Sequence, residues 1–217
     1  MIVDTRRLWL RPVLPDDADL LVSLDADPLV MRYVSDGEPT SRAQIVDWTI
    51  PRARAEFAAH GTGIWTLIHK PTLEFAGWVA LRRPRHGGRK RELELSYRVP
   101  RDLWGRGLAT EASRAMLAAA FTAHPAERVF AGTAPSNTAS RRVLEKIGMR
   151  TVAGAPDERA DDVEYQILRH HWLLRDGTTY IEDRQAGALR ARAALMLEMA
   201  LPGSAYVYQG EELGLFE

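Results

Sequence analysis

The stretch Leu95–Glu111, with the sequence LSYRVPRDLWGRGLATE, carries the most information about the fold of this 217-residue chain. From Leu93 to Val99, hydrophobic and polar residues alternate, which is the period of a β-strand with one buried face. Pro100 ends the strand, a short loop with two glycines follows, and Ala109–Ala123 has the composition of a strong helix. The stretch therefore predicts a strand that leads through a glycine loop into a helix.

The glycine loop has the properties of an anion-binding site. The first N–H groups of a helix have no partner within the helix, and the helix dipole makes that end positive. Gly105 and Gly107 let a phosphate approach the backbone closely, and Arg106 adds a positive charge. The spacing alone has little specificity, because Gly-x-Gly after a strand is commonly a turn and a helix cap. It matches neither a dinucleotide fingerprint, which needs a third glycine in a βαβ unit, nor a P-loop.

The elements on either side of this loop predict a mixed α/β fold on one sheet. Upstream we expect strands at 8–13, 64–69, 75–81 and 93–99, a helix over 15–24 that Pro28 stops, and a helical stretch over 41–60. Ser41 is the expected cap of that stretch, and Pro51 is expected to kink or split it. Downstream we expect a strand at 129–133, a helix over 137–147, and strands at 149–153 and 163–168. Strands first, then helices and strands in alternation, indicate a single sheet with flanking helices.

Composition excludes several classes of protein. Lys plus Arg and Asp plus Glu each number 29, so the net charge of zero gives no reason to expect a nucleic-acid or membrane-surface partner. The absence of cysteine excludes disulfides, thiolate metal sites and a cysteine nucleophile. No signal peptide or long apolar run is present, which predicts a cytoplasmic protein. No metal site is predicted, because His170 and His171, read as strand neighbours, would face opposite ways.

Four separated stretches, in order along residues 1–172, resemble the GNAT superfamily of N-acetyltransferases. WGRGLATEA after ELELSYRVP resembles their acetyl-CoA pyrophosphate loop, and SNTASRRVLEKIGM resembles their second signature. RLWLRPVLPDDADLLVSLDADPLVMRYV and DDVEYQILRHHW resemble the start and the closing strand of the Rim-type branch, the ribosomal-protein N-terminal acetyltransferases and their relatives. The superfamily loop often has Gln or Arg where this chain has Asp102, and we expect that carboxylate to face solvent.

The resemblance implies an acetyl-CoA-dependent N-acetyltransferase built on a mixed, mostly antiparallel sheet that is split in a V between two strands. Acetyl-CoA would lie in the split, and a backbone N–H between Tyr97 and Val99 would polarise the thioester carbonyl. The implied cofactor-binding residues are Ser96, Tyr97, Arg98, Val99, Trp104, Gly105, Arg106, Gly107, Leu108, Ala109, Thr110, Asn137, Ser140 and Arg141.

The resemblance also implies the catalytic groups. Glu94 is the candidate general base, directly or through a water, and Glu92 on the same strand face is the second choice. Ser140 is the candidate acid for the leaving thiolate, because Leu144 stands where relatives often have a tyrosine. Glu111, in the first turn of its helix, is expected to be structural.

Tyr33, Trp48 and Asp161 are the candidate acceptor-binding residues, because an aromatic ring and an acid suit an ammonium group. The alternative is that Trp48 and Trp65 belong to the core. The expected acceptor is a protein N-terminal α-amine or a small-molecule amine, and the expected state is a monomer or homodimer. A non-catalytic module that binds acetyl-CoA or has a regulatory role remains the alternative function.

The last part of the chain, 173–217, is a tail of different character. ALRARAALMLEMALPGSAYVYQGEELGL resembles a segment of the alpha-amylase superfamily, close to alpha-glucosidases and trehalose synthases. The catalytic carboxylates of that family lie upstream of the segment and are not present, and one helix and one strand cannot form a barrel. We therefore exclude glycosidase activity and infer a gene fusion. The tail could dock on the body, swap into a neighbouring protomer or be idle, and a nonfunctional fusion product is a further alternative.

Overall fold

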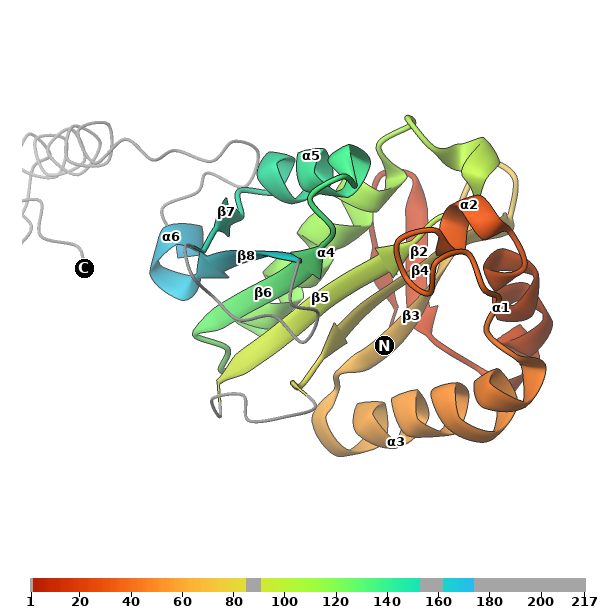
Figure 1. Cartoon of the computed structure of the whole chain (residues 1–217). Coiled ribbons are helices and arrows are strands. Elements are labelled where there is room, and N and C mark those ends of the chain that lie inside the picture. The colour runs from red at the N-terminus through yellow and green to blue at the C-terminus, as the bar shows by residue number, and fades with distance from the viewer. Residues whose placement is uncertain (1, 85–90, 153–161, 174–217) are drawn as a thin grey trace, which may run out of the picture. The chain divides into compact units, whose positions relative to one another are not determined.

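One mixed sheet organises the described part of the chain (Figure 1). The computed structural model describes residues 2–84, 91–152 and 162–173. Within them the strand order is β1-β2-β3-β4-β5-β6-β8-β7, and the strands are β1 (Val3–Asp4), β2 (Leu8–Pro12), β3 (Gly63–His69), β4 (Glu74–Arg82), β5 (Glu92–Arg98), β6 (Arg128–Thr133), β7 (Arg150–Thr151) and β8 (Val163–Leu168). The helices are η1 (Pro15–Asp17), α1 (Ala18–Asp25), α2 (Pro28–Met31), η2 (Gln44–Thr49), α3 (Ile50–His60), η3 (Arg101–Leu103), α4 (Leu108–Thr122), α5 (Thr138–Lys146) and α6 (Arg169–Leu173).

The direction of pairing agrees with the predicted fold class. Neighbouring strands are antiparallel from β1 through β5 and again between β7 and β8, whereas β5 and β6 are parallel. Both edges of the sheet, β1 and β7, are strands of two residues. The mixed, mostly antiparallel α/β sheet with flanking helices is confirmed.

Different helices cover the two faces of the sheet. Arg98, at the end of β5, reaches α1, where its Nη1 donates to both carboxylate oxygens of Asp25 at 2.6 and 2.7 Å. Alternate residues of a strand face opposite sides, so Leu93, Leu95 and Tyr97 face the other way. On that side α4 packs on β4 and β5, and the two leucines are buried. The even-numbered residues of β5 therefore share the α1 face.

The helical stretch predicted over 41–60 runs from 42 to 60 without a break, and it changes from π-helical to α-helical geometry beside Pro51. η2 has π-helical geometry, in which the N–H of Ile50 donates to the carbonyl of Ile45, and α3 begins at Ile50. Pro51 has no N–H to donate and is tolerated in the first turn of a helix. Ser41 caps the stretch as predicted, because its Oγ accepts from the N–H of Gln44 at 3.1 Å. The buried residues of η2 and α3 form one core with α1, β3 and β4.

β4 has a β-bulge beside the end of β5. Leu67 pairs with Gly77, but the next residue, Ile68, pairs with Phe75, so Ala76 is the extra residue. Gly77 has φ +108°, and a Cβ there would lie 2.1 Å from the carbonyl oxygen of Arg98. Glycine is therefore required at this bulge, beside the end of β5.

The two parallel strands separate part-way along their length. β5 and β6 pair at Glu92↔Arg128, Leu93↔Val129 and Glu94↔Phe130, and the pairing ends there although both strands continue. On its other edge β5 stays paired with β4 as far as Trp78↔Arg98. The sheet therefore opens into a V between β5 and β6, at the place that the resemblance implies.

Some local predictions need correction. Pro28 begins the short helix α2, whose cap is Asp27 with its carboxylate accepting from the N–H of Leu29 at 2.9 Å. His170 and His171 lie on α6 and not on a strand, with ring centroids 4.1 Å apart, so the argument that they face opposite ways is wrong. β1 was not expected from the sequence. Among the described residues no group of three or more His, Asp or Glu side chains is placed to hold a metal ion.

The chain divides into two compact units, Met1–Ile167 and Leu168–Glu217. Of the second unit only α6 and the residue before it are described, so the helix and strand expected for the tail lie outside the described residues. No helix in the described ranges has the length and apolar character needed to cross a bilayer.

Candidate active site

The glycine loop has the geometry predicted for it. Gly105 and Gly107 have φ of +74° and +77°, in the left-handed region, and Gly107 is the N-cap of α4. The first helical hydrogen bond runs from the N–H of Glu111 to the carbonyl of Gly107 at 3.0 Å. A Cβ on Gly105 would meet nothing within 4 Å, so the space beside the loop is open. The loop thus presents the positive end of a fifteen-residue helix to an open surface.

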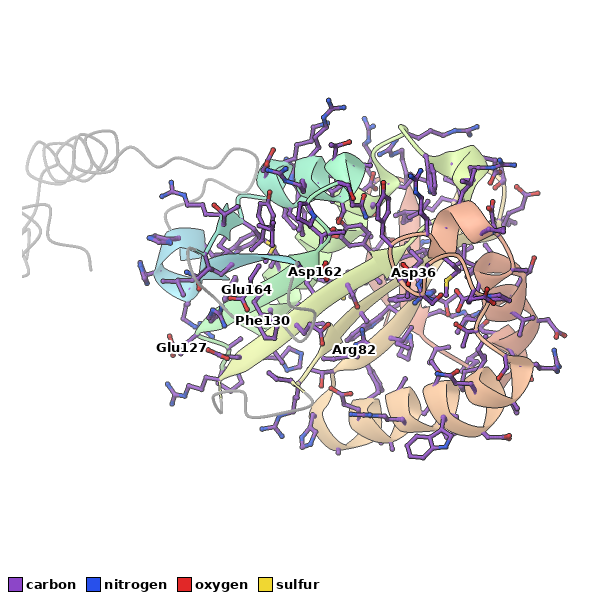
Figure 2. The ribbon with its side chains drawn as sticks, in the orientation of Figure 1. Asp36, Arg82, Glu127, Phe130, Asp162 and Glu164 are labelled. Atoms are coloured by element: carbon purple, nitrogen blue, oxygen red, sulfur yellow. The ribbon has the colours of Figure 1, made fainter. Side chains whose placement is uncertain are left out.

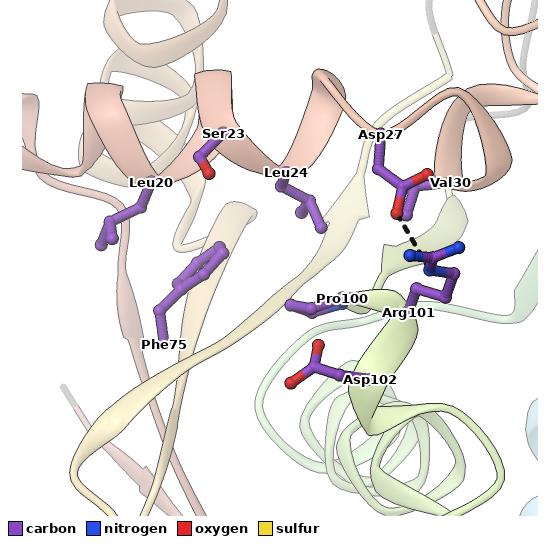
Figure 3. A pocket seen from close by; sticks show the side chains of 9 residues that line it. All are labelled: Leu20, Ser23, Leu24, Asp27, Val30, Phe75, Pro100, Arg101 and Asp102. Carbon is purple, nitrogen blue, oxygen red and sulfur yellow. Dashed lines mark ion pairs between the residues drawn. The ribbon is translucent and has the colours of Figure 1, made fainter.

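Trp104 fixes the approach to the loop from β5. Its indole Nε1 donates to the carbonyl of Val99 at 2.7 Å, although 47% of the residue is exposed. Asp102, on η3, is exposed as predicted. The side chain of Asp102 lines a surface pocket of about 240 Å³ beneath α1, together with Leu24, Phe75 and Pro100 (Figure 3). None of the site residues predicted from the sequence lines this pocket.

The N-terminal hairpin contacts the other side of the loop. Glu111 accepts hydrogen bonds of 2.7 Å from the Thr5 hydroxyl, the Arg7 backbone N–H and the Arg7 Nε. Arg7 Nη1 also donates to the carbonyl of Arg106 at 2.8 Å. Burial alone would raise the pKa of Glu111, but these hydrogen bonds and the Arg7 charge outweigh it and lower the pKa. Glu111 therefore has the structural role that was expected.

Two predicted residues meet at the start of α5. Asn137 caps this helix, with its side chain accepting from the N–H of Ser140 at 3.1 Å. The hydroxyl of Tyr97 on β5 lies 3.0 Å from Ser140 Oγ and also donates to the Ser140 carbonyl at 3.3 Å. Burial raises the pKa of Tyr97 to about 12, so this phenol stays protonated. Tyr97 thus connects β5 to α5 and holds the candidate acid.

The two arginines on α5 differ. Arg141 Nε donates to the Tyr165 hydroxyl at 3.0 Å and its Nη1 donates to the Pro135 carbonyl at 3.3 Å. The hydrogen bond to Tyr165 raises the pKa of Arg141. Arg142 is exposed, as predicted. Arg141 therefore has partners within the fold, while Arg142 coats the helix.

Glu94 lies where the V opens, on the sheet face that α1 shares. It is in the last pair before β5 and β6 separate, opposite Phe130, and on its other side it pairs with Arg82 of β4. Arg82 Nη2 donates to Ser96 Oγ at 2.6 Å and lies 4.0 Å from Glu94 Oε1. The Glu94 side chain is 32% exposed. Figure 2 shows Arg82, Phe130 and Glu164 along this face.

Glu92 has a different environment from Glu94. Arg128 of β6 pairs with Glu92 at 3.3 Å, also forms an ion pair with Glu164, and donates from its Nε to Gln166 at 2.6 Å. The Glu92 side chain is only 12% exposed. The structure thus engages Glu92 in a network across β5, β6 and β8, and leaves Glu94 as the glutamate at the opening.

The two acceptor candidates that the structure describes lie on different elements, Tyr33 after α2 and Trp48 on η2. The Tyr33 hydroxyl donates to the Ser136 carbonyl at 3.4 Å, which places Tyr33 at the loop before α5. Trp48 lies on η2, whose main contacts are with α1 and α3, and it is 68% exposed, so its assignment to the core is wrong. Trp65 is fully buried and does belong to the core. Asp161 lies outside the described residues.

Sequence reasoning missed three side chains that organise the site, namely Arg7, Arg82 and Arg128. Arg7 acts on a residue 104 positions away, and no local pattern shows such a contact. Arg82 and Arg128 follow from strand register, because each is the cross-strand partner of a predicted glutamate. The signal for both arginines is therefore the strand register, which sets each of them opposite a glutamate of β5.

Comparisons with known proteins agree with this geometry. Residues 7–150 match the family described as Acetyltransferase (GNAT) domain. The chain is 27% identical over 223 residues to the FsC-acetyl coenzyme A-N(2)-transacetylase of Aspergillus fumigatus, covering 96% of this chain and 93% of that protein. It is 35% identical over 134 residues to the uncharacterised Bacillus subtilis protein YkkB, covering 62% and 76%. The crystal structure of Mycobacterium smegmatis RimJ in complex with a coenzyme A disulfide is 26% identical, has a TM-score of 0.61, and covers 79% of this chain and 86% of that chain. A family match over more than half of the chain, joined to a split sheet and a glycine loop, shows that the chain belongs to the GNAT acetyltransferase family.

Proposed function

We propose that the protein transfers the acetyl group of acetyl-CoA to a primary amine by direct attack, with Glu94 as general base. The observation that carries this proposal is the end of β5–β6 pairing at Glu94↔Phe130. It puts a carboxylate, partly exposed to solvent, at the point where the strands open. Glu92, the second choice, is engaged by Arg128.

The residues present fit acetyl-CoA as the donor substrate. The loop of Gly105 and Gly107 would hold the pyrophosphate, because it offers helix N–H groups beside open space. The β5 edge beyond Glu94, which β6 has left, would hold the pantetheine arm through backbone hydrogen bonds. When bound, acetyl-CoA supplies an activated acetyl group on a thioester sulfur. The other residues proposed for this role are those named from the resemblance, among them Trp104, Arg106 and Arg141.

Two groups would transfer protons in the reaction, Glu94 as the base and Ser140 as the acid. Glu94, directly or through a water, takes a proton from the ammonium group so that the neutral nitrogen can form the new N–C bond. As the C–S bond breaks, the nitrogen loses its second proton to solvent, and the leaving sulfur takes a proton from Ser140 Oγ, which regains one from solvent. The Tyr97 hydroxyl orients Ser140 by the hydrogen bond of 3.0 Å. Tyr97 is thus a positioning residue for the candidate acid.

For the acceptor, we infer a nitrogen nucleophile, either a protein α-amine or a small-molecule amine. The name of the Aspergillus relative, an N(2)-transacetylase, supports nitrogen. The likeness to RimJ supports placement in the Rim-type branch. Among the acceptor candidates, Tyr33 contacts the loop before α5, the helix that carries Ser140. Trp48 and Asp161 stay predictions. The tail stays a proposed fusion segment attached to a 1–172 acetyltransferase domain.

Calorimetry with acetyl-CoA tests this proposal on the wild type and on Gly107→Trp. Tight binding to the wild type that is lost in the variant is expected, because a side chain strains the left-handed N-cap at Gly107 and its Cβ would lie 3.5 Å from Arg7 Nη2, so the loop must change shape. Amines and N-terminal peptides are then screened for turnover, first with the wild type and then with Glu94→Gln. Binding without turnover for every acceptor would favour the non-catalytic module, and no binding to the wild type would overturn the proposal.

A further inference from the structure

Arg7 connects the N-terminal hairpin to the glycine loop through a set of contacts that the proposed reaction does not use. Its backbone N–H and Nε both donate to Glu111 at 2.7 Å, and its Nη1 donates to the carbonyl of Arg106 at 2.8 Å. Its Nη2 lies 3.5 Å from where a Cβ of Gly107 would be. The side chains of Arg7 and Glu111 are 30% and 16% exposed, so the pair is shielded more than a surface ion pair.

The hydrogen bond to Arg106 fixes the direction of one peptide group. In a trans peptide the C=O and the following N–H point in opposite directions. Because the Arg106 carbonyl points at Arg7, the N–H of Gly107 points away from Arg7. This N–H belongs to the exposed N-cap of α4, where the helix dipole is positive. Arg106 lies between Gly105 and Gly107, and glycines restrict the backbone little. The contact with Arg7 is therefore what sets the orientation of this peptide.

Glu111 makes the arrangement rigid. Its carboxylate is held by Thr5 and Arg7, while its own backbone N–H closes the first turn of α4 on Gly107. The guanidinium is therefore fixed at two points, on the carboxylate of the helix and on the carbonyl of the loop. A bidentate, planar group suits such a double contact, whereas a lysine would supply only a point charge.

We propose that Arg7 is a positioning residue for donor binding, which holds the Arg106–Gly107 peptide with its N–H turned outward to receive a phosphate oxygen. The inference rests on the proposed function, since it takes the pyrophosphate of CoA as the ligand of the loop. It adds a residue from the N-terminal hairpin to a site otherwise built from β5, α4 and α5. Affinity for a donor with a pyrophosphate should depend on Arg7, and affinity for pantetheine alone should not.

The test compares two ligands on the full-length chain. Calorimetry measures the Kd of CoA, and ligand-observed NMR measures the Kd of pantetheine, for the wild type, Arg7→Ala, Arg7→Lys and Arg6→Ala. Arg6 is the matched control, because it is the exposed neighbour with the same charge. We expect Arg7→Ala to weaken CoA binding by at least about tenfold, Arg7→Lys to fall between, and pantetheine binding to stay unchanged.

Several outcomes would overturn the inference. CoA affinity in Arg7→Ala that equals that of Arg6→Ala would show that the loop orients itself. Equal losses for CoA and pantetheine would indicate a general structural effect. If circular dichroism shows that Arg7→Ala does not fold, Arg7→Lys and Glu111→Gln are judged by the same ratio of the two affinities. A wild type that binds no CoA would overturn the proposed function itself. A wild type that binds CoA, with Arg7 variants that bind it equally well, would overturn only the inference about Arg7.

Discussion

The two halves of β5 have the same alternation of residues but different surroundings. The first half, from Glu92 to Glu94, pairs with β6, and its Glu92 forms an ion pair with Arg128; β4 pairs with this half only at Glu94. The second half, from Leu95 to Arg98, keeps β4 on one edge and loses β6 on the other. The edge of β5 that faces β6 is used by the sheet in the first half, whereas in the second half its backbone groups are open to a ligand. One strand thus combines a structural half with a half that we propose binds the donor, and Glu94 lies at the boundary.

The largest effect should come from replacing Glu94, at the boundary, and the matched control replaces Glu92 in the first half. Glu94→Gln should lower kcat by about 10²–10⁴-fold, because it removes the base, and leave stability almost unchanged since its side chain is partly exposed. Glu92→Gln should keep most of kcat but lower the free energy of unfolding by about 1–3 kcal/mol, because Arg128 is mostly buried. Steady-state rates and urea unfolding of both variants measure this. Equal rate losses would mean that the two halves do not differ in chemistry.

The next effect tests how much the second half depends on β4. Gly77→Ala would place a Cβ 2.1 Å from the carbonyl oxygen of Arg98 and should cost about 3 kcal/mol or more. Gly105→Ala is the control, because it has a similarly positive φ but open space, and it should cost about 1–2 kcal/mol. Thermal unfolding of the two variants distinguishes close approach from backbone strain. Equal shifts in Tm would contradict the proposed dependence on β4.

The smallest effect is one of pH, in the loop that follows the second half. Hydrogen bonds from Thr5 and Arg7 outweigh burial and lower the pKa of Glu111 below its ordinary value of 4.5. A carboxylate with a lowered folded pKa stabilises the protein above the unfolded pKa, and this stabilisation is lost as the pH falls toward the folded pKa. The wild type should therefore lose stability more steeply below about pH 4.5 than Glu111→Gln does. Parallel slopes in a pH series of urea unfolding would contradict this.

The predictions that succeeded rest on local sequence. The period of Leu93 to Val99, the glycine pair and Asn137 as a cap each depend on a few neighbouring residues, and each has the predicted place in the fold. Pro51 was expected to kink or split its helix, but the helical run continues through it, and π-helical geometry just before it accommodates the missing N–H. The prediction that His170 and His171 lie on a strand was wrong, because Arg169–Leu173 form the short helix α6. Two adjacent histidines carry no periodic pattern that would indicate a helix.

The site could be predicted only where one strand or loop determines it. Glu94 and Ser140 were named from their motifs, but the hydroxyl of Tyr97 beside Ser140 depends on how α5 packs over β5. In the same way, the engagement of Glu92 by Arg128 depends on strand register, and the contact of Arg7 with Glu111 depends on the whole fold. Residue types can be read along the chain, whereas partners far apart in sequence are set by tertiary structure. Trp48 shows that residue type alone can mislead, since tryptophan is typical of cores and binding sites but this one is exposed on η2.

The two-residue strands at the edges of the sheet have a consequence for self-association. An edge strand offers unpaired N–H and C=O groups to another chain, and long flat edges are templates for aggregation. Here β1 and β7 span only two residues each, and each includes a charged one, Asp4 and Arg150. A second molecule adding to either described edge would gain few backbone hydrogen bonds and would have to desolvate a charge. Among the described residues, the two sheet edges therefore offer little to edge-to-edge polymerisation, which matters for a chain whose net charge of zero gives little mutual repulsion.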